Sequence, residues 1–418
     1  MNIKDLYKLY SENFLVDTDT RKIRQNTIFF ALKGENFNGN KFAENALELG
    51  ASYAIVDEKK HKTSNRIILV KDVLHTLQKL ANHHRRQLKT PIIALTGSNG
   101  KTTTKELINC VLSKGYKTTA TIGNLNNHIG VPLTLLSFNK NTEIGIVEMG
   151  ANHKNEIELL CSICEPDYGY ITNFGKAHLE GFGSIEGVIE GKSELYSYLE
   201  LNNKIAFINS NDLIQVEKTK NIKRVDFNSG IEFSGVNPFV KLTFNKLQIQ
   251  SNLIGKYNFT NIAASVTIGK YFNISEQDIK NALENYFPNN NRSQVIETRF
   301  NKIILDAYNA NPSSMAAALE NFSMLKSKNK TVILGDMFEL GQNCDEEHQE
   351  VADLARKLNI KNIFLVGEHF YKTNTEARQF VNFEELKKYL TINKLKNNSI
   401  LIKGSRGMKL ERVLEFLN

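Results

Sequence analysis

Hydrophobic positions along the chain fall into short runs that are separated by longer helix-like stretches. In the first part these runs are "NTIFFAL", "YAIVD" and "RIILV", each of a length typical of a strand. From "PIIALTG" onward, the runs "IGIVEM", "YGYITNF" and "KIAFIN" alternate with segments of helical character. This alternation predicts a mostly parallel sheet with helices on its faces.

The pattern changes twice more along the chain. Between about Val225 and Leu253 it predicts strands, and a helix is expected to begin near Asn258. From about Arg292 the runs "KIILDAY", "KTVILGD", "NIFLVGE" and "SILIKGS" alternate with helical stretches, the arrangement of a Rossmann-like domain. We therefore predict an α/β protein of three domains. They are a small α/β N-terminal domain at residues 1–88, a central domain with a mostly parallel sheet at 89–291, and a C-terminal Rossmann-like domain at 292–418.

The size of the chain agrees with this division, because 418 residues exceed one ordinary core. No apolar run approaches the roughly 18 residues of a membrane span. The start, "MNIKDLYKLYSENF", is polar and mixed in charge, unlike a signal peptide. We expect a cytoplasmic protein with no membrane span and with four reduced cysteines. Cys161 and Cys164 form a lone CxxC without a second ligand pair, so ordinary packing is expected.

The net charge of the chain excludes few classes of binding partner. Lys and Arg exceed Asp and Glu, 53 against 45, for a net charge of +8. The basic residues are scattered and form no stripe, so nucleic acid is not an expected partner. A multiply anionic small substrate and a simple lysine-rich composition both explain the excess.

A phosphate-binding loop is predicted where the strand in "LTGSNGKTTT" meets a helix. Glycines let backbone N–H groups converge on phosphate oxygens, and the helix N-terminus adds its positive dipole. Lys101 can reach the β- and γ-phosphates of a nucleotide, and the Thr102 hydroxyl can bind Mg²⁺. Leu95 replaces the first glycine of the longer motif, so this is the short GxxGK(T) form. The central domain is therefore predicted to be a P-loop ATPase domain, with these loop residues around the nucleotide: Gly97, Ser98, Asn99, Gly100, Lys101, Thr102 and Thr103.

Further candidates follow other strands of the same domain. Glu148 ends the apolar run of "IGIVEMGANH" and is a second Mg²⁺ anchor, with helix capping as the alternative. His178 lies in a loop after the next strand, where ligands of open α/β sheets bind, although a single histidine is more often structural. The spacing around Lys192 in "IEGKSELY" is that of a solvated helix lysine.

Taken in order, these segments resemble a known family. "TGSNGKTTTKE", "GNLNNHIGVPLTLL", "EMGANH", "NFGKAHLEGFGS" and "EGKSELY" are similar to motifs of the Mur ligases, the ATP-dependent amide ligases of peptidoglycan precursor synthesis. "DAYNANPSSMAAAL", "GDMFELG" and "KGSRGMKLE" resemble the family member that joins D-alanyl-D-alanine to UDP-N-acetylmuramoyl-tripeptide. The resemblance spans essentially the whole chain. It implies that the three domains bind the UDP-sugar peptide, ATP and the incoming amine, respectively. The third domain is then expected to close on ATP, and the enzyme is expected to be a monomer.

The resemblance also implies roles for individual residues at the nucleotide. Lys101 would stabilise the transferring phosphoryl group, and Thr102 with Glu148 would hold a first Mg²⁺. His178 and a Lys192 carbamylated by CO₂ would hold a second Mg²⁺. The remaining nucleotide contacts that it implies are Asn261 at adenine, Arg292 near the γ-phosphate, Asp306 at the ribose, and Tyr308 and Asn309 beside the nucleotide. This chain has Tyr257 where the family usually has histidine.

Substrate contacts are implied in two further regions. "DTDTRKI" and "FFALKGENFNGN" resemble the uridine-binding segments of the family, although Asn38-Gly39-Asn40 replaces the Asp-Gly-His of many relatives. "GNLNNHIG" matches the stretch that faces the reacting carboxylate, with turn formation as the alternative for each asparagine. The implied substrate-binding residues are Thr20, Arg21, Ala31, Leu32, Gly34, Asn124, Asn126 and Asn127.

Parts of the sequence are also compatible with other functions. A sister ligase that adds a diamino acid and a folylpolyglutamate synthase share the same core, but "YNANPSSM" and "GDMFELG" argue against both, and a DNPR-type signature is absent. A P-loop GTPase would need an NKxD motif, which the sequence lacks. A basic nucleic-acid-binding protein predicts steeply salt-dependent binding, which the scattered charge does not favour.

Overall fold

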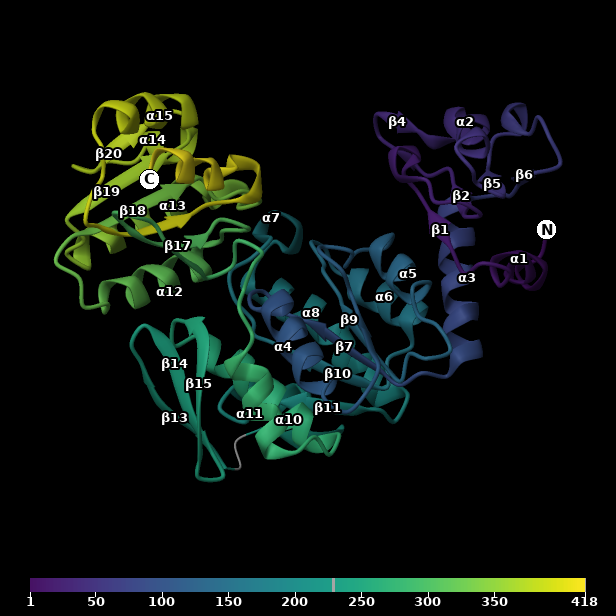
Figure 1. The fold of residues 1–418 in the computed structure, drawn as a ribbon, viewed down its shortest axis with the longest axis horizontal. Coiled ribbons are helices and arrows are strands. Elements are labelled where there is room, and N and C mark those ends of the chain that lie inside the picture. Colours follow the sequence, from purple (N-terminus) through teal and green to yellow (C-terminus); the bar gives the residue numbers. More distant parts are fainter. Residues whose placement is uncertain (228–229, 418) are drawn as a thin grey trace.

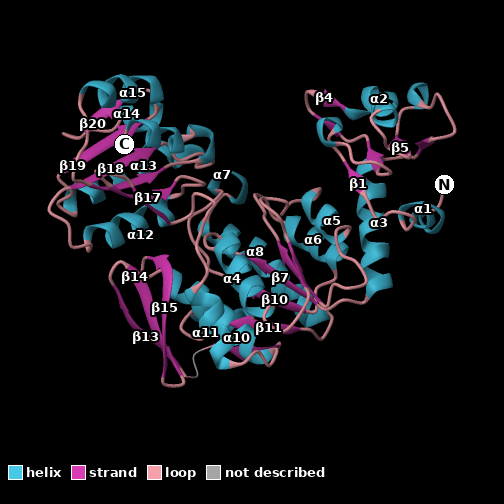
Figure 2. Cartoon of the chain, viewed as in Figure 1, coloured by secondary structure: helices cyan, strands magenta, loops and turns pink. Residues whose placement is uncertain are grey.

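The computed structural model describes residues 1–227 and 230–417 and contains three α/β parts in chain order. In Figure 1 the N-terminal part (purple) and the C-terminal part (green to yellow) lie at opposite sides of the central part. Figure 2 shows that each part combines helices with its own strands. The α/β class with three domains is therefore confirmed.

The N-terminal part is built on a four-stranded parallel sheet of order β1-β2-β5-β6. One face packs on α2, and the opposite face packs on α1 and on the long helix α3. Asp72 caps α3 by accepting a hydrogen bond from the His75 N–H at 2.7 Å. The elements are α1 (Ile3–Tyr10), β1 (Val16–Asp17), β2 (Ile28–Phe30), β3 (Lys33–Gly34), β4 (Phe37–Asn38), α2 (Ala43–Glu48), β5 (Tyr53–Val56), β6 (Ile67–Leu69) and α3 (Val73–Leu88).

The central part contains a six-stranded parallel sheet of order β12-β11-β10-β7-β9-β8. Successive residues of β7 alternate between the two faces, since Ile92 and Ala94 pack toward α5, α6 and α8 while Ile93 and Leu95 pack toward α4 and α10. The elements are β7 (Ile92–Thr96), α4 (Lys101–Leu112), β8 (Thr118–Ala120), α5 (Gly130–Leu135), β9 (Ile144–Glu148), α6 (Glu156–Cys164), β10 (Tyr168–Ile171), α7 (Leu179–Phe182), α8 (Ile185–Leu201), β11 (Ile205–Ile208), α9 (Leu213–Lys218) and β12 (Lys223–Asp226).

A three-stranded antiparallel sheet completes the central part and packs against α10 and α11. The strands predicted between Val225 and Leu253 and the helix predicted near Asn258 are confirmed by these elements. They are β13 (Ile231–Val236), β14 (Phe239–Phe244), β15 (Leu247–Ile254), α10 (Asn258–Tyr271) and α11 (Glu276–Glu284).

The C-terminal part has a six-stranded mixed sheet of order β16-β17-β21-β18-β19-β20, in which β16 runs antiparallel to β17. Helices α12 and α13 cover one face, and α15 covers the other. The elements are β16 (Gln294–Glu297), β17 (Lys302–Asp306), α12 (Pro312–Ser323), β18 (Lys330–Gly335), α13 (Cys344–Lys357), β19 (Asn362–Val366), α14 (Glu368–Tyr371), β20 (Arg378–Phe380), α15 (Phe383–Ile392) and β21 (Ser399–Lys403).

Two further expectations concern helices and thiols. Among the described residues, no helix combines the length and the apolar character that crossing a bilayer requires. Cys110, Cys161, Cys164 and Cys344 are free thiols. Cys161 and Cys164 lie fully buried in the core around α6, which confirms the packing interpretation of the CxxC.

Candidate functional site

A cavity of about 800 Å³ lies between the central and C-terminal parts. Most of the predicted site residues line it, although they come from strands and loops far apart in the sequence. Those that line it are Ser98, Asn99, Gly100, Lys101, Thr102, Thr103, Asn124, Asn126, Asn127, Glu148, His178, Asn261, Arg292, Asp306, Tyr308 and Asn309.

The phosphate loop connects β7 to α4 through backbone conformations that favour glycine. Gly97 has φ +140° and Gly100 has φ +81°. A Cβ on Gly97 would come within 2.0 Å of the Thr172 hydroxyl, and one on Gly100 within 2.6 Å of Asn261 Oδ1. These two positions therefore need glycine for both conformation and space.

Lys101 opens α4, and its ammonium folds back over the loop. Nζ donates hydrogen bonds to Gly97 O at 2.6 Å and to Ser98 O at 3.4 Å. Burial, together with the nearby Arg292 guanidinium, lowers the pKa of Lys101 to about 8 against the opposing effect of Glu148. The loop thus holds a cation that its own carbonyl groups satisfy.

Glu148 ends β9 and reaches the start of α4. The Thr102 hydroxyl donates to Glu148 Oε1 at 3.2 Å, and Asn126 Nδ2 donates to the same oxygen at 2.8 Å. The side chain is 1% exposed, and Oε2 has no hydrogen-bond partner among residues 1–227 and 230–417. Helix α6 begins only at Glu156, so helix capping does not explain Glu148. A buried carboxylate oxygen without a donor is a position suited to a cation.

Lys192 is fully buried on α8, so the prediction of a solvated helix lysine is wrong. Its Nζ donates to Ala151 O at 2.9 Å and lies 5.0 Å from the centre of the Phe182 ring. Burial, with the positive charge of Lys101, holds the pKa of Lys192 well below its ordinary value. The short helix α7 carries Phe182 over this lysine, a tertiary contact that spacing along α8 cannot reveal.

His178 and the C-terminal segment "GDMFELG" meet across the domain junction. His178 Nδ1 makes a short hydrogen bond with Glu339 Oε2, and this contact holds the pKa of the Glu339 carboxyl below its ordinary value. Both residues have positive φ, +53° and +63°. His178 lies at the cavity, while Lys192 does not line it.

The C-terminal wall of the cavity is cationic. The Arg292 guanidinium lies 3.8 Å from the centre of the Tyr308 ring, and that of Arg406 lies 5.7 Å from it. Arg292 Nε is buried without a hydrogen-bond partner in the described part of the chain. Asp306 accepts a hydrogen bond from Lys403 Nζ at 2.6 Å, because β17 and β21 are neighbours with these two residues in register.

Direct hydrogen bonds also link the two walls. Asn311 Nδ2 donates to Asn99 Oδ1 of the phosphate loop at 2.8 Å, and the Lys176 N–H donates to Ser313 Oγ at 2.9 Å. Sequence reasoning assigned no role to Asn311, Lys403 or Arg406. All three lie within segments quoted above, "YNANPSSM" and "KGSRGMKLE", so a search for polar residues near those motifs would have found them.

Comparisons with known proteins agree with this geometry. Three family descriptions match successive parts of the chain: "Mur ligase family, catalytic domain" at residues 15–85, "Mur ligase middle domain" at 95–269, and "Mur ligase, glutamate ligase domain" at 291–406. The UDP-N-acetylmuramoyl-tripeptide–D-alanyl-D-alanine ligase of Bacillus subtilis (strain 168) is 35% identical over 426 residues, which cover 96% of this chain and 92% of the relative. The chain belongs to the Mur ligase family.

Solved Mur ligase structures extend the similarity to the whole fold. A crystal structure of MurF from Acinetobacter baumannii matches with a TM-score of 0.85 and 31% identity, covering 96% of this chain and 92% of the other. MurF from Thermotoga maritima, solved in complex with ADP, matches with a TM-score of 0.84 and 27% identity, covering 96% of each chain.

The expected adenine contact of this Mur ligase lies at the base of the phosphate loop. Asn261, on α10, is buried, donates to Asn258 Oδ1 at 2.8 Å and accepts from the Thr104 hydroxyl at 3.1 Å. Tyr257 also lines the cavity, and its hydroxyl shares a 2.9 Å hydrogen bond with Ser293 Oγ. Burial raises the pKa of the Tyr257 phenol, which is neutral.

The predicted uridine-binding residues of this Mur ligase do not line the cavity between the two larger parts. Thr20, Leu32 and Gly34 keep some exposure, Arg21 pairs with Asp19, and Ala31 is fully buried. The Asn38-Gly39-Asn40 turn has a structural task here, because Asn40 Oδ1 accepts from the Asp57 N–H at 2.9 Å.

The three predicted carboxylate-facing asparagines have different environments. Asn126 contacts Glu148 as described above, and Asn124 is exposed at the cavity. Asn127 Oδ1 accepts from the N–H groups of Ile129 at 3.1 Å and Gly130 at 2.9 Å, which is the turn-forming alternative. Asn127 nevertheless lies in the cavity wall.

Proposed function

We propose that this Mur ligase joins D-alanyl-D-alanine to UDP-N-acetylmuramoyl-tripeptide at the expense of ATP, in peptidoglycan precursor synthesis. The terminal carboxylate of the tripeptide attacks the γ-phosphorus of ATP and gives an acyl phosphate and ADP. The amine of D-alanyl-D-alanine then attacks the acyl carbon and releases phosphate. The products are UDP-N-acetylmuramoyl-pentapeptide, ADP and phosphate.

One observation carries the proposal: a single cavity collects the phosphate-loop Lys101, the buried Glu148 and the C-terminal Arg292. Attack of a carboxylate on a phosphate brings anions together, and Lys101 and Arg292 offset that repulsion from two sides. The full-length similarity to relatives named for D-alanyl-D-alanine supports the choice of amine.

The residues at the start of α4 fit a Mg²⁺ ion. Glu148 Oε2 is buried without a donor in the described part of the chain, and the Thr102 hydroxyl lies beside the same carboxylate. Both are hard oxygen ligands of the kind that Mg²⁺ takes. When bound, the ion would neutralise charge on the phosphate oxygens. Thr102 and Glu148 would hold it, and Asn126 would orient the carboxylate.

A second Mg²⁺ would use His178 and a carbamylated Lys192. With its depressed pKa, Lys192 has a neutral amine fraction that can attack CO₂. The new N–C bond yields a carbamate, and the amine loses a proton to solvent. The neutral amine at this buried position thereby becomes an anion, which suits a cation. His178 would exchange its Glu339 contact for this role.

The other predicted site residues would complete the reaction scheme. Asn261 would contact adenine, Asp306 the ribose, and Tyr308 and Asn309 the flank of the nucleotide, so ATP would draw the C-terminal domain onto the central domain. Thr20, Arg21, Ala31, Leu32 and Gly34 would hold uridine, while Asn124, Asn126 and Asn127 would face the tripeptide carboxylate. We propose that the enzyme acts as a monomer. We also propose that the enzyme acts in the cytoplasm, where a UDP-linked substrate would be available.

Phosphate release measures the proposed reaction directly. The purified chain is incubated with ATP, Mg²⁺, D-alanyl-D-alanine and UDP-tripeptides that end in either lysine or diaminopimelate. We expect release only when both the tripeptide and the dipeptide are present. ATP turnover that neither substrate changes would overturn the proposal. Turnover with a free diamino acid and a UDP-dipeptide, or with folate and glutamate, would identify one of the alternative ligases instead.

A further inference from the structure

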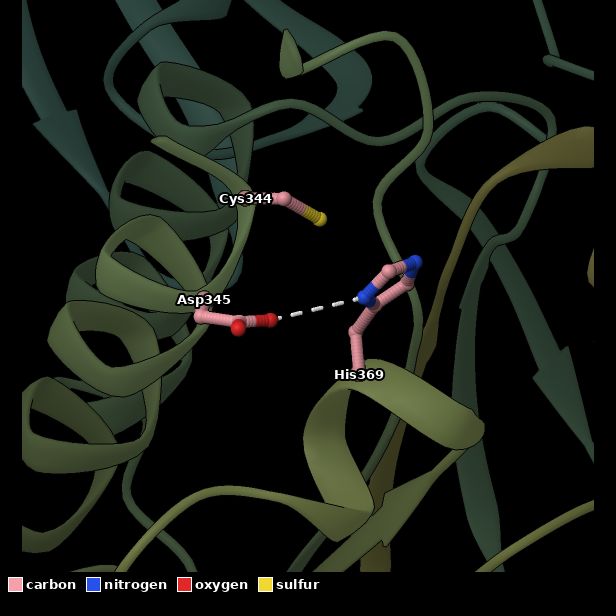
Figure 3. Close-up of side chains that lie close together, drawn as sticks. All are labelled: Cys344, Asp345 and His369. Atoms are coloured by element: carbon pink, nitrogen blue, oxygen red, sulfur yellow. Dashed lines mark ion pairs between the residues drawn. The ribbon is translucent and has the colours of Figure 1, made fainter. Parts of the chain in front are cut away.

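Three side chains of metal-binding type come together in the C-terminal domain, outside the cavity between the domains. Cys344 and Asp345 are the first residues of α13, and His369 lies on α14 (Figure 3). One thiol, one carboxylate and one imidazole atom lie within 4.8 Å of one another. Asp345 Oδ1 is 3.6 Å from His369 Nδ1, and Figure 3 shows the three side chains directed toward a shared space.

The backbone around this group is fixed by buried polar residues. Asp336 is 3% exposed and accepts hydrogen bonds from the N–H groups of His369 at 3.0 Å and Phe370 at 2.9 Å. These bonds anchor the first turn of α14, which carries His369. Gly367 precedes that turn with φ +128°, and a Cβ there would lie 2.2 Å from the Asp336 carboxyl carbon. Glycine is therefore required for this close approach.

His348 fixes the other side of the group. It is fully buried, and its Nε2 accepts from the Met337 N–H at 3.0 Å. Nδ1 therefore carries the proton and donates it to Cys344 O at 2.6 Å, which holds the first turn of α13. The His348 ring also lies against the His369 ring, with centroids 5.2 Å apart. Such supporting contacts resemble those that orient metal ligands.

One ligand atom of the group lacks a partner. The His369 side chain is 35% exposed and that of Asp345 is 72% exposed, but His369 Nδ1 itself is buried, and within the described residues no atom forms a hydrogen bond with it. The 3.6 Å separation from Asp345 Oδ1 is too long for a hydrogen bond. A buried nitrogen left in this way normally loses free energy, so its orientation toward a thiol and a carboxylate calls for an occupant.

We propose that Cys344, Asp345 and His369 bind one Zn²⁺ ion, with water as the fourth ligand. Thiolate, imidazole and carboxylate are the protein ligands that Zn²⁺ takes, whereas Mg²⁺ avoids sulfur. A tetrahedral ion would hold the three atoms about 3.5 Å from one another, close to the present 3.6 Å between Asp345 Oδ1 and His369 Nδ1, and side-chain rotation can bring the thiol to the same distance. The ion would join the starts of α13 and α14 and stabilise the folded C-terminal domain.

The test uses the full chain, freed of metal by a chelator and dialysed. Co²⁺ is titrated first, because a cobalt–thiolate bond gives a near-ultraviolet charge-transfer band that other ligands do not. Zn²⁺ is then measured by competition and by calorimetry, in wild type and in Cys344→Ser, His369→Gln and Asp345→Asn. Cys110→Ser is the matched control at a half-buried thiol elsewhere, and Glu148→Gln removes the proposed Mg²⁺ ligand.

We expect one Zn²⁺ per chain and a rise in Tm on adding Zn²⁺. Cys344→Ser should abolish the charge-transfer band, and His369→Gln should weaken Zn²⁺ at least about tenfold. Cys110→Ser and Glu148→Gln should retain both the band and the stoichiometry. The proposal is overturned if Cys344→Ser keeps the band, if Glu148→Gln loses the ion, or if neither metal binds. None of these readouts depends on ligase activity, so they are independent of the proposed function.

Discussion

The two domain junctions of this chain differ in the polarity of their contacts. At the N-terminal junction, α3 packs directly on α5 and α6, α1 packs on α3, and apolar side chains of both domains form one continuous core. At the C-terminal junction, Ile254 of the central domain packs into the C-terminal core, but the contacts around the cavity of about 800 Å³ are hydrogen bonds and ion pairs, among them that of Lys176 with Glu347. An apolar junction is stable without ligand, whereas a polar, hollow one gains most when a ligand fills it.

The hydrogen bonds at the two junctions also differ in their exposure to water. Tyr10 OH donates to Leu136 O at 2.7 Å, and both Tyr10 and Leu136 belong to the shared core. Buried bonds of this kind fix orientation because water cannot replace them. The Asn99–Asn311 bond, by comparison, borders the cavity, where a phosphate or water can compete. We infer that the first junction positions substrate domains permanently and that the second one works by closing.

The largest expected effect is at the polar junction. Lys101→Ala removes the cation that we propose stabilises the transferring phosphoryl group, and it should lower kcat by about 10²–10³-fold, as for other single electrostatic donors. Tm of the ligand-free protein should change little, since the ammonium is bonded only to its own loop carbonyls among the contacts given above. Activity assays and thermal unfolding check both parts. Lys114→Ala, at an exposed lysine just beyond α4, is the control and should keep full activity.

The apolar junction should give the reverse result. Leu80→Ala, on the buried face of α3, removes methyl groups from the shared core and should lower the free energy of unfolding by about 2–5 kcal/mol. kcat per folded molecule should stay near that of the wild type. Urea unfolding with parallel activity measurements tests this, and Leu201→Ala, at 83% exposed, is the matched control. A large loss of kcat in the folded Leu80→Ala protein would contradict the inference that this junction contributes to stability and not to catalysis.

The sequence was informative where structure is local. The strand, glycine turn and helix around Lys101 follow from neighbouring residues, and the structure has them at β7 and α4. The burial of Lys192 could not be predicted in this way, because Phe182 and Ala151 enclose it from other elements. The pairing of Asp306 with Lys403 depends on the order of strands in the sheet, which spacing along the chain does not determine.

A smaller loss is expected for Lys192. Lys192→Ala should lose about tenfold or more of the activity, and short carboxylic acids that enter the vacated space should restore part of it. Lys192→Arg should not regain activity, because it stays positive and cannot be carbamylated. The assay is paired with ¹³C NMR of protein equilibrated with labelled bicarbonate, and Lys154→Ala, a half-exposed lysine near α8, is the control. Full activity of a folded Lys192→Arg protein would show that the carbamate has no part in the reaction.

The smallest effect concerns pH at the apolar junction. His84 is fully buried there, with Nε2 donating to Phe138 O at 3.0 Å and Nδ1 accepting from Tyr7 OH at 3.2 Å. Burial lowers the pKa of His84 in the folded chain, so below pH about 6.5 the unfolded chain binds more protons than the folded one. The free energy of unfolding should therefore be constant above that pH and fall as pH decreases, by at most about 1.4 kcal/mol per pH unit from this residue.

Gln can keep both hydrogen bonds without titrating. Urea unfolding at pH 7 and pH 5.5 should show a smaller loss in His84→Gln than in wild type, while His75→Gln, exposed on the same helix, should behave like wild type. An equal loss in all three proteins would mean that acid acts elsewhere and that this junction is insensitive to pH.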